Sequence, residues 1–225
     1  MPEMGYQGRA VLVFGGAGAL GGGLAAAFAQ AGASVTGADR HLPSEAHRLD
    51  GVRYHAVDVL DDAALGALFD AEPVPWAVIN TVGGYAPHAS LAELDPGELT
   101  GQLNLNLVTA ALVTKHALRR MGEAGEGRIV HTASRAANVT RGQGFAYSVS
   151  KLGVLHLVAM AADEVRGTGI TVNSVVPSFI DTPANRAALP DADYSSWPKI
   201  PDIAGAFVFL ASPGAHLVSG AAIPV

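Results

Sequence analysis

Apolar, strand-like runs alternate with helical patterns along almost the whole chain. The expected strands are Arg9–Phe14, Ala33–Ala38, Val52–Val57, Trp76–Asn80, Arg128–Thr132, Ile170–Val176 and Ala221–Val225. The expected helices are Ala19–Ala31, Asp61–Asp70, Glu98–Met121, Phe145–Arg166 and Pro201–Ala211. Because parallel strands are joined by right-handed crossovers, this order predicts an α/β fold with a doubly wound parallel sheet of about seven strands and helices on both faces.

The length of 225 residues and the hydrophobic share of 49% fit one domain spanning 1–225 with a sizeable core. The Pro-rich, polar segment Asp181–Pro201 departs from the alternation. Such excursions beside a ligand crevice often form lids, so we expect a substrate lid around 181–201.

Charge and composition exclude several classes of protein. A formal net charge of −6 argues against nucleic acid as a partner, since duplex binding needs basic surface. The absence of cysteine excludes disulfides and thiolate sites. The N-terminus has no signal-peptide pattern, and the apolar run Leu152–Ala162 is shorter than a membrane helix, so we expect no membrane association and a cytoplasmic location.

The eight histidines are scattered, and none forms a pair with the close helical spacing of a zinc site. We therefore expect no metal. His88 and His131 lie near predicted strand ends, where a minor substrate role stays open, but a structural role is favoured.

A glycine-rich loop follows the first strand and opens the first helix, at Gly15, Gly16, Gly18 and Gly21. Glycines there let backbone N–H groups approach a pyrophosphate at a helix N-terminus, with Ala19 and Leu20 in the first turn. Such a loop is a weak signal alone. Its place in a βαβ unit indicates a Rossmann-type dinucleotide site.

Acidic residues after the next two strands support this interpretation. Asp39 ends the second strand, where a carboxylate can bind the ribose hydroxyls, and Asp58 with Val59 follows the third, where the adenine would lie. Asp39 would repel a 2′-phosphate, so NAD(H) is preferred. Arg40 could accommodate that phosphate, so NADP(H) stays open.

Tyr147 and Lys151 stand one turn apart on a predicted helix. A lysine ammonium favours the phenolate, so we expect it to lower the tyrosine pKa toward neutral pH and to make Tyr147 a proton donor or acceptor. Ser134 follows the fifth strand, where its hydroxyl could polarise a substrate oxygen. The alternative is an ordinary amphipathic helix, since Tyr-x-x-x-Lys often occurs by chance.

Several further motifs lie in the same order along the chain. They are Asn80-Thr81-Val82-Gly83, Asn106, and Val172 to Pro177 followed by Asp181-Thr182-Pro183. With the glycine loop and Ser134, Tyr147 and Lys151, they resemble the short-chain dehydrogenase/reductase family over nearly the full length.

The resemblance implies roles for these residues. Tyr147 would be the general acid–base, and Lys151 would lower its pKa and bind the nicotinamide ribose. Ser134 would orient the substrate, and Asn106 would hold a water in the proton relay. Thr182 would contact the coenzyme, Val82 and Gly83 would also bind it, and the segment that ends at Pro177 would bracket the nicotinamide.

Where the sequence departs from the common family pattern, it resembles the dihydropteridine reductases. Phe14 replaces a threonine, Ala19 replaces a glycine, and Ser178 replaces the glycine after Pro177. The segment from Asp181 to Trp197 also resembles the lid of those reductases. Ser134 does not, because they have alanine there.

Three functions follow from these patterns. The leading one is hydride transfer from NADH to a quinonoid dihydropterin-like acceptor. The second is a carbonyl or alcohol dehydrogenase that uses Ser134, and the third is a dinucleotide sensor without catalysis. The four residues Asn106, Ser134, Tyr147 and Lys151 argue against the third.

Two aromatic residues and two helices suggest binding surfaces. Tyr85 and Trp197 could flank a flat small-molecule substrate, or could simply pack the lid on the sheet. The two long helices carry more apolar residues than one sheet-facing stripe needs. Relatives pair these helices between subunits, so we expect a homodimer or homotetramer.

Overall fold

The computed structural model describes residues 5–86, 90–138 and 144–225. In these residues one parallel sheet has the strand order β3 (Arg53–Ala56), β2 (Ser34–Asp39), β1 (Ala10–Phe14), β4 (Ala77–Asn80), β5 (Glu126–Thr132), β6 (Gly169–Val176) and β7 (Ala222–Pro224). The strand order reverses direction at β1, where Phe14 pairs with Ala38 on one side and with Asn80 on the other. The doubly wound parallel fold is thus confirmed, with the switch point between β1 and β4.

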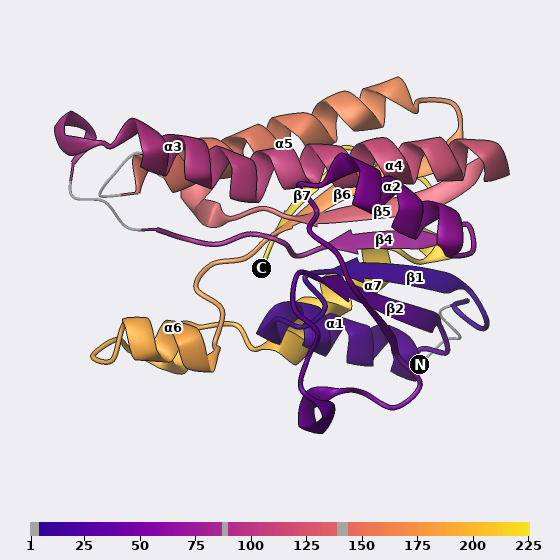
Figure 1. Cartoon of the computed structure of the whole chain (residues 1–225), viewed down its shortest axis with the longest axis horizontal. Helices are drawn as coiled ribbons and strands as arrows, with labels where there is room; N and C mark the ends of the chain where they lie inside the picture. The colour runs from indigo at the N-terminus through magenta and orange to yellow at the C-terminus, as the bar shows by residue number, and fades with distance from the viewer. Residues whose placement is uncertain (1–4, 87–89, 139–143) are drawn as a thin grey trace.

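Helices cover both faces of the sheet (Figure 1). One face carries α1 (Ala19–Gln30) and α7 (Ile200–Leu210), and the other carries α2 (Asp62–Ala71), α4 (Thr109–Ala124) and α5 (Phe145–Glu164). The short helix α6 (Pro183–Ala188) lies apart from these layers. Single 3₁₀ turns are η1 (Glu45–His47), η2 (Leu91–Glu93), η4 (Arg135–Asn138), η5 (Tyr194–Ser196) and η6 (Pro213–Ala215).

The helix expected at Glu98–Met121 is interrupted. It consists of α3 (Pro96–Gln102), the π-helical segment η3 (Leu103–Val108) and α4. A π segment widens the helix by changing which carbonyl each N–H reaches, and such segments are frequent at functional sites. Apolar periodicity does not reveal it.

The two largest hydrophobic clusters of the core lie on opposite faces of the sheet, and a small third one contains Ala110, Ala133, Val154 and Val176. Val11 and Val13 of β1 point into the cluster with α1 and α7, whereas Leu12 and Phe14 point into the cluster with α2, α4 and α5. This is the period-two alternation of a strand that is buried on both faces. Phe207 of α7 is fully buried in the first cluster.

Helix α5 is long and apolar enough to cross a membrane, with a mean hydropathy of 1.4 over its best window. The expectation that the chain lacks such a stretch rested on uninterrupted apolar runs, and this helix passes the broader criterion. Core helices pass the same criterion, and α5 packs on β6, η3 and η4. It is the one such helix in the described residues.

We predict that Phe207→Ala destabilises the protein by about 3–5 kcal/mol, because it leaves a cavity under the sheet. Phe209→Ala, in the same helix but half-exposed, is the control and should cost less than about 1 kcal/mol. Urea denaturation measures both free energies of unfolding. Equal losses for the two variants would contradict the assignment of the core.

Candidate active site

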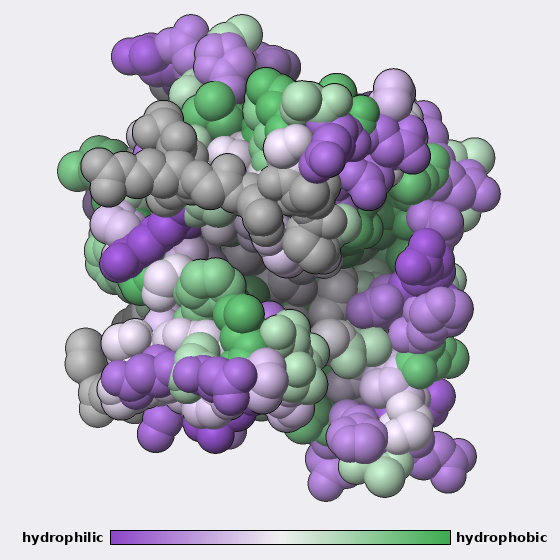
Figure 2. All heavy atoms as spheres, turned by 90° about the vertical axis from the view of Figure 1, so that its left-hand side faces the viewer, coloured by the Kyte–Doolittle hydropathy of each residue, from purple (hydrophilic) through white to green (hydrophobic). Residues whose placement is uncertain are grey.

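The candidate site lies at the carboxyl ends of the strands, where parallel sheets bind their ligands. Figure 2 views this end of the molecule, where hydrophobic and hydrophilic surface surround a hollow. The loops that meet here are 15–18 after β1, 39–41 after β2, 81–86 after β4, 133–135 after β5 and 177–182 after β6.

The glycine loop is shaped by close backbone contacts. Gly15 has a φ of 79°, and its N–H donates to the Ala38 carbonyl at 2.8 Å. A Cβ on Gly16 would lie 2.8 Å from the Gly37 Cα, and one on Gly21 would lie 2.0 Å from the Gly15 oxygen. Larger residues cannot occupy these positions without moving the backbone.

This loop presents a cradle for an anion. Helix α1 begins after Gly18, so the N–H groups of Ala19, Leu20 and Gly21 have no intrahelical acceptor and form the positive end of the helix dipole. Ala19 is exposed and carries only a methyl group. The loop therefore fits the pyrophosphate of a dinucleotide.

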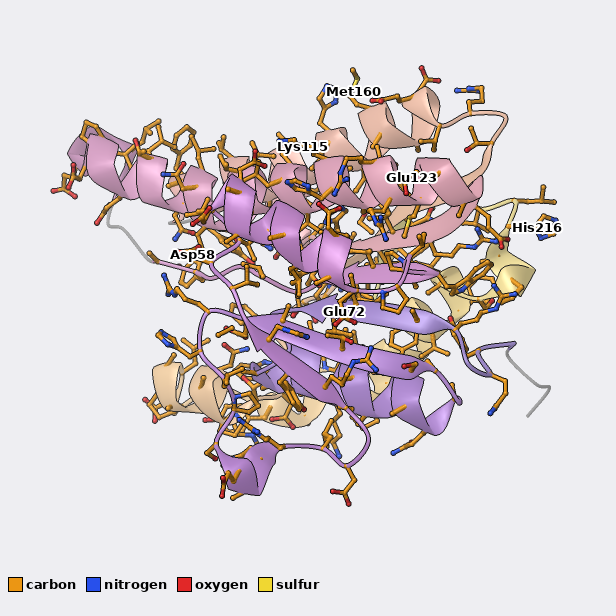
Figure 3. The ribbon with its side chains drawn as sticks, turned by 45° about the vertical axis from the view of Figure 1, so that its right-hand side comes forward. Asp58, Glu72, Lys115, Glu123, Met160 and His216 are labelled. Carbon is orange, nitrogen blue, oxygen red and sulfur yellow. The ribbon has the colours of Figure 1, made fainter. Side chains whose placement is uncertain are left out.

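Asp39 lies at the rim of this cradle. Its Oδ2 accepts from the Ala17 N–H at 3.1 Å, which ties the end of β2 to the loop. Arg40 follows it and is exposed. Asp58 is also exposed near this edge (Figure 3), where its Oδ1 accepts from the Leu60 N–H at 2.9 Å, and Val59 is buried.

Asn106 of η3 clamps the loop after β4. Its Oδ1 accepts from the Gly84 N–H and its Nδ2 donates to the Gly84 carbonyl, both at 3.1 Å. A Cβ on Gly83 would lie 2.6 Å from the Asn106 Oδ1 and 3.0 Å from the Lys151 Nζ. The structure therefore brings Gly83, Asn106 and Lys151 together.

Lys151 and Tyr147 lie in α5, and Ser134 faces them from the end of β5. The Lys151 Nζ is buried, donates to the Thr132 carbonyl at 2.9 Å, and lies 5.9 Å from the centre of the Tyr147 ring. Ser134 is buried, and its side chain interacts with Tyr147 in a way that lowers the Tyr147 pKa. These three side chains form one polar group within the site.

The pKa of Tyr147 differs from the sequence-based expectation. Burial raises it, the interaction with Ser134 opposes this, and the neighbouring Tyr85 adds to the rise. Burial also lowers the pKa of Lys151, to about 8, and the Lys151 Nζ is directed at the Thr132 carbonyl.

Tyr85 and Trp197 occupy different surroundings. Tyr85 is 56% exposed, and its ring meets the Tyr147 ring edge to face at 5.2 Å. Trp197 stacks on Phe179 at 5.5 Å and meets Tyr194 at 4.9 Å. Tyr85 therefore lies beside Tyr147, whereas Trp197 belongs to an aromatic cluster with Phe179 and Tyr194.

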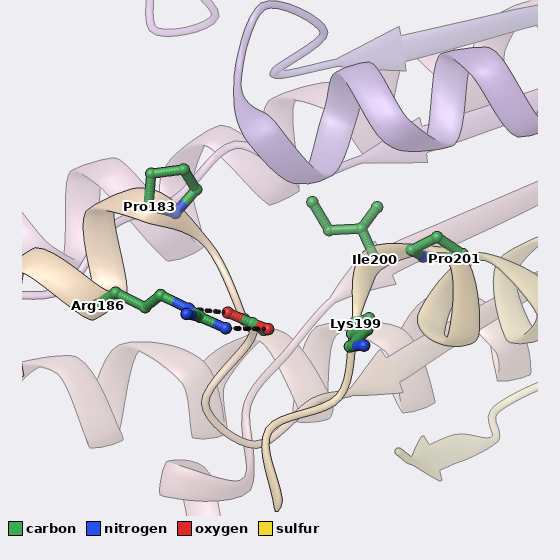
Figure 4. A pocket seen from close by; sticks show the side chains of 6 residues that line it. Pro183, Arg186, Lys199, Ile200 and Pro201 are labelled. Carbon is green, nitrogen blue, oxygen red and sulfur yellow. Dashed lines mark hydrogen bonds and ion pairs between the residues drawn. The ribbon is translucent and has the colours of Figure 1, made fainter. Parts of the chain in front are cut away.

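The 181–201 segment contains helix α6, which the sequence reading left out. Thr182 caps it by accepting from the Asn185 N–H at 3.2 Å, and Pro183 starts it. A threonine followed by a proline is typical of the start of a helix, so this pair could have predicted α6 from the sequence. A pocket of about 480 Å³ lies between α6 and the start of α7 (Figure 4), lined by Asp181, Pro183, Arg186, Lys199, Ile200 and Pro201.

Some contacts at the site were not predicted. The Thr81 Oγ1 donates to the Phe14 carbonyl at 2.8 Å and joins the ends of β1 and β4. Gly144, with a φ of 102°, leaves room for the Tyr85 ring, 3.3 Å from the position of a Cβ. The left-handed glycine is visible only in three dimensions. His88 lies outside the described residues.

Comparisons with known proteins show the family of this chain. The family model described as "Enoyl-(Acyl carrier protein) reductase" matches residues 15–225. Cis-4-hydroxycyclohexanecarboxylate dehydrogenase of Sinomonas cyclohexanicum is 33% identical, with 96% of this chain and 94% of that protein covered. The chain belongs to the short-chain dehydrogenase/reductase family.

Other short-chain dehydrogenases/reductases show the same likeness. D-threitol dehydrogenase of Mycolicibacterium smegmatis is 33% identical over 96% of this chain and 90% of its own. The solved structure of a short-chain dehydrogenase/reductase from Mycobacterium ulcerans matches with a TM-score of 0.89 and 29% identity, covering 98% of this chain and 89% of that one. The matched proteins are oxidoreductases of varied substrates, and members of the family use NAD(P)H.

We predict that Lys151 makes stability depend on pH. Its pKa falls from 10.5 to about 8 on folding, so between these values the unfolded chain holds a proton that the folded chain has lost. Stability relative to Lys151→Met should therefore rise with pH above about 8, on the order of 1 kcal/mol per unit. Urea denaturation from pH 7 to 9.5 measures this.

The control variant is Lys115→Met, because the Lys115 side chain is 56% exposed. The stability of wild type relative to Lys115→Met should stay constant across the same window, because both proteins contain Lys151. Parallel curves for wild type and Lys151→Met would contradict a buried, pKa-shifted lysine.

Proposed function

We propose that this protein catalyses reversible hydride transfer between NAD(H) and a small secondary alcohol or the corresponding carbonyl compound. The supporting observation is the interaction of the Ser134 side chain with Tyr147, which opposes the rise of the Tyr147 pKa, beside the buried Lys151. A hydroxyl next to a proton-donating phenol suits a carbonyl oxygen, which needs both polarisation and a proton.

The coenzyme contributes the hydride, and the residues of this chain would bind it along the strand ends. We assign the pyrophosphate to Gly15, Gly18, Ala19, Leu20 and Gly21, and the adenosine to Asp39, Arg40, Asp58 and Val59. The nicotinamide and its ribose are assigned to Val82, Gly83, Tyr147, Lys151, Pro177 and Thr182.

In the reducing direction, the Tyr147 Oη gives its proton to the substrate oxygen. The raised pKa of Tyr147 keeps this proton on the phenol at neutral pH. The Ser134 Oγ accepts from the Ala136 N–H at 3.2 Å, so its own hydrogen is free to be directed at the substrate oxygen or at Tyr147. In the oxidising direction the same oxygen of Tyr147 takes the proton back.

Lys151 and Asn106 support this step. With a pKa of about 8, the Lys151 Nζ holds or releases a proton near neutral pH, beside the Tyr147 ring. Asn106 fixes Gly84 and thereby the loop next to Lys151. We further propose that Asn106 holds a water that links Lys151 to solvent.

The relatives suggest the size of the substrate. One is named for a hydroxylated cyclohexane carboxylate and another for a four-carbon polyol, D-threitol. Tyr85, half-exposed beside Tyr147, offers a ring surface to a cyclic substrate. Small cyclic and acyclic secondary alcohols are therefore the first substrates to test.

A quinonoid dihydropterin remains the second candidate. It is favoured by the aromatic cluster of Phe179, Tyr194 and Trp197, which could cover a flat heterocycle. Such an acceptor takes hydride into a conjugated ring and does not need Ser134. The two functions thus make opposite demands on this serine.

We predict that Tyr147→Phe lowers turnover at least about 100-fold while NADH still binds, because the variant lacks the acidic proton. The assay follows NAD+ reduction with a panel of secondary alcohols and NADH oxidation with quinonoid dihydropterin. NADH fluorescence measures binding separately. Near-full activity of the variant would contradict the mechanism.

Ser134→Ala then separates the two substrate classes. It should lower carbonyl and alcohol turnover about 100-fold and leave pterin reduction nearly unchanged. Wild-type turnover of pterin alone would transfer the assignment to the second candidate. Tight NADH binding without turnover of any acceptor would favour a dinucleotide sensor.

A further prediction concerns the choice of coenzyme. Asp39→Ala should weaken NADH binding and reduce the preference for NADH over NADPH at least about tenfold, since the carboxylate no longer repels a 2′-phosphate. Titration with both coenzymes measures this. Asp58→Ala, at the neighbouring strand end, is the control that should leave the ratio unchanged.

We also propose that the protein forms a homodimer or homotetramer joined through α4 and α5. Each subunit would be one catalytic domain with a lid over 181–201, and the protein would be located in the cytoplasm. A groove of about 560 Å³ runs between these helices, lined in part by Lys115, Leu157 and Met160. Lys115 and Met160 lie on the outer side of this helical layer (Figure 3), and Leu152 and Met160 are exposed apolar side chains that a second subunit would cover.

A further inference from the structure

We propose that His131 is a positioning residue, which as a neutral imidazole fixes the loop from Asn80 to Gly84 against the helix that carries Asn106. The inference rests on the proposed function in that this loop borders the coenzyme and the catalytic lysine. It assigns a purpose to a buried titratable group that the proposed mechanism does not use.

His131 lies near the end of β5 and is completely buried. Its Nδ1 is 3.2 Å from the Asn80 Nδ2 on the neighbouring strand β4. Its Nε2 is 2.9 Å from the Thr114 Oγ1 on α4. The imidazole therefore joins three elements of the fold.

The surrounding groups determine which nitrogen holds the hydrogen. The Asn80 Oδ1 accepts from the Val82 N–H at 3.1 Å, so the Asn80 Nδ2 donates to the His131 Nδ1. The Thr114 hydroxyl donates to the Ala110 carbonyl at 2.8 Å, so its oxygen is free to accept from the His131 Nε2–H. All four bonds run in one direction.

This chain of bonds requires a neutral ring. A proton on Nδ1 would place two donors against each other, and turning the Asn80 amide would then oppose its NH2 group to the Val82 N–H. The charged group that acts on His131 is Lys151; Asn80 and Thr114 are neutral. Burial, together with Lys151, lowers the pKa of His131 to about 4, which agrees with this requirement.

One end of this chain of hydrogen bonds lies at the loop after β4. Val82 is held through Asn80 and His131, and Gly84 is held by Asn106. Between them, Gly83 lies against the Asn106 Oδ1 and the Lys151 Nζ, with no room for a Cβ. The loop is thus fixed on both sides of the residue that borders the lysine.

The other end of this chain of hydrogen bonds reaches the helix that carries Asn106. Ala110 and Thr114 follow Asn106 in the same continuous helix, and all three are buried. His131 therefore couples the position of the loop to the position of the helix. A slip between the two would misplace Gly83 relative to Lys151.

A second buried histidine provides a matched control. His116 is a residue of α4 and is 6% exposed. Its Nε2 is 2.8 Å from the Asp62 Oδ1 at the start of α2, away from the loop after β4. Replacing His116 therefore removes a buried imidazole but leaves the chain of hydrogen bonds through His131 intact.

The first test is nitrogen-15 NMR of the histidine rings in wild-type protein. The His131 signal is assigned by its loss in the His131→Gln variant. We expect the neutral ring with hydrogen on Nε2 from pH 5.5 to 8.5. A hydrogen on Nδ1, or titration within this range, would overturn the proposal.

The second test is NADH binding without substrate, by fluorescence titration. His131→Leu should raise the Kd about tenfold or more, because an unsatisfied Asn80 amide releases the loop. His131→Gln, whose amide offers one acceptor and one donor, should stay within about threefold of wild type. His116→Leu should lower the Tm but leave the Kd unchanged.

Wild-type affinity in His131→Leu would overturn the inference, as would equal weakening in His116→Leu. If His131→Leu does not fold, Thr114→Val breaks the far end of the chain and should weaken NADH binding in the same direction; an unchanged Kd there would overturn the proposal. Binding needs no substrate, so a wrong substrate assignment changes turnover only and leaves these outcomes readable.

Discussion

The rest of the structure depends on how closely three strand ends approach one another at the switch point. Gly16 lies on Gly37 with no room for a side chain between them, and Gly15 is close to Thr81. The Thr81 hydroxyl then joins the end of β4 to β1. This approach exposes the first N–H groups of α1 toward the crevice, and it brings the loop after β4 to the same edge.

Burial of polar groups around that loop determines its chemistry. Lys151, Ser134 and His131 are all removed from water, and each has a hydrogen-bond partner. Desolvation lowers the pKa of Lys151 and His131, and raises that of Tyr147. The site thus keeps a protonated phenol beside a lysine whose pKa lies near the physiological range.

Sequence patterns predicted the sheet well and the local geometry less well. The expected strands differ from the observed ones by a residue or two at the ends, and for the central strands the signal was strong because they are apolar runs buried on both faces. The π segment around Asn106 and the short helix α6 were missed, since neither changes apolar periodicity. The pKa of Tyr147 was expected to fall, but burial, which a spacing does not reveal, raises it.

The sequence by itself determined the layers of the fold, the place of the glycine loop and the identity of the polar side chains at the strand ends. These follow from periodicity and residue type, which are local properties. Tertiary structure decided which groups form hydrogen bonds, such as His131 with Asn80. It also decided that Tyr85 contacts Tyr147, whereas Trp197 packs in another cluster. Distance, direction and desolvation arise only when distant segments pack together.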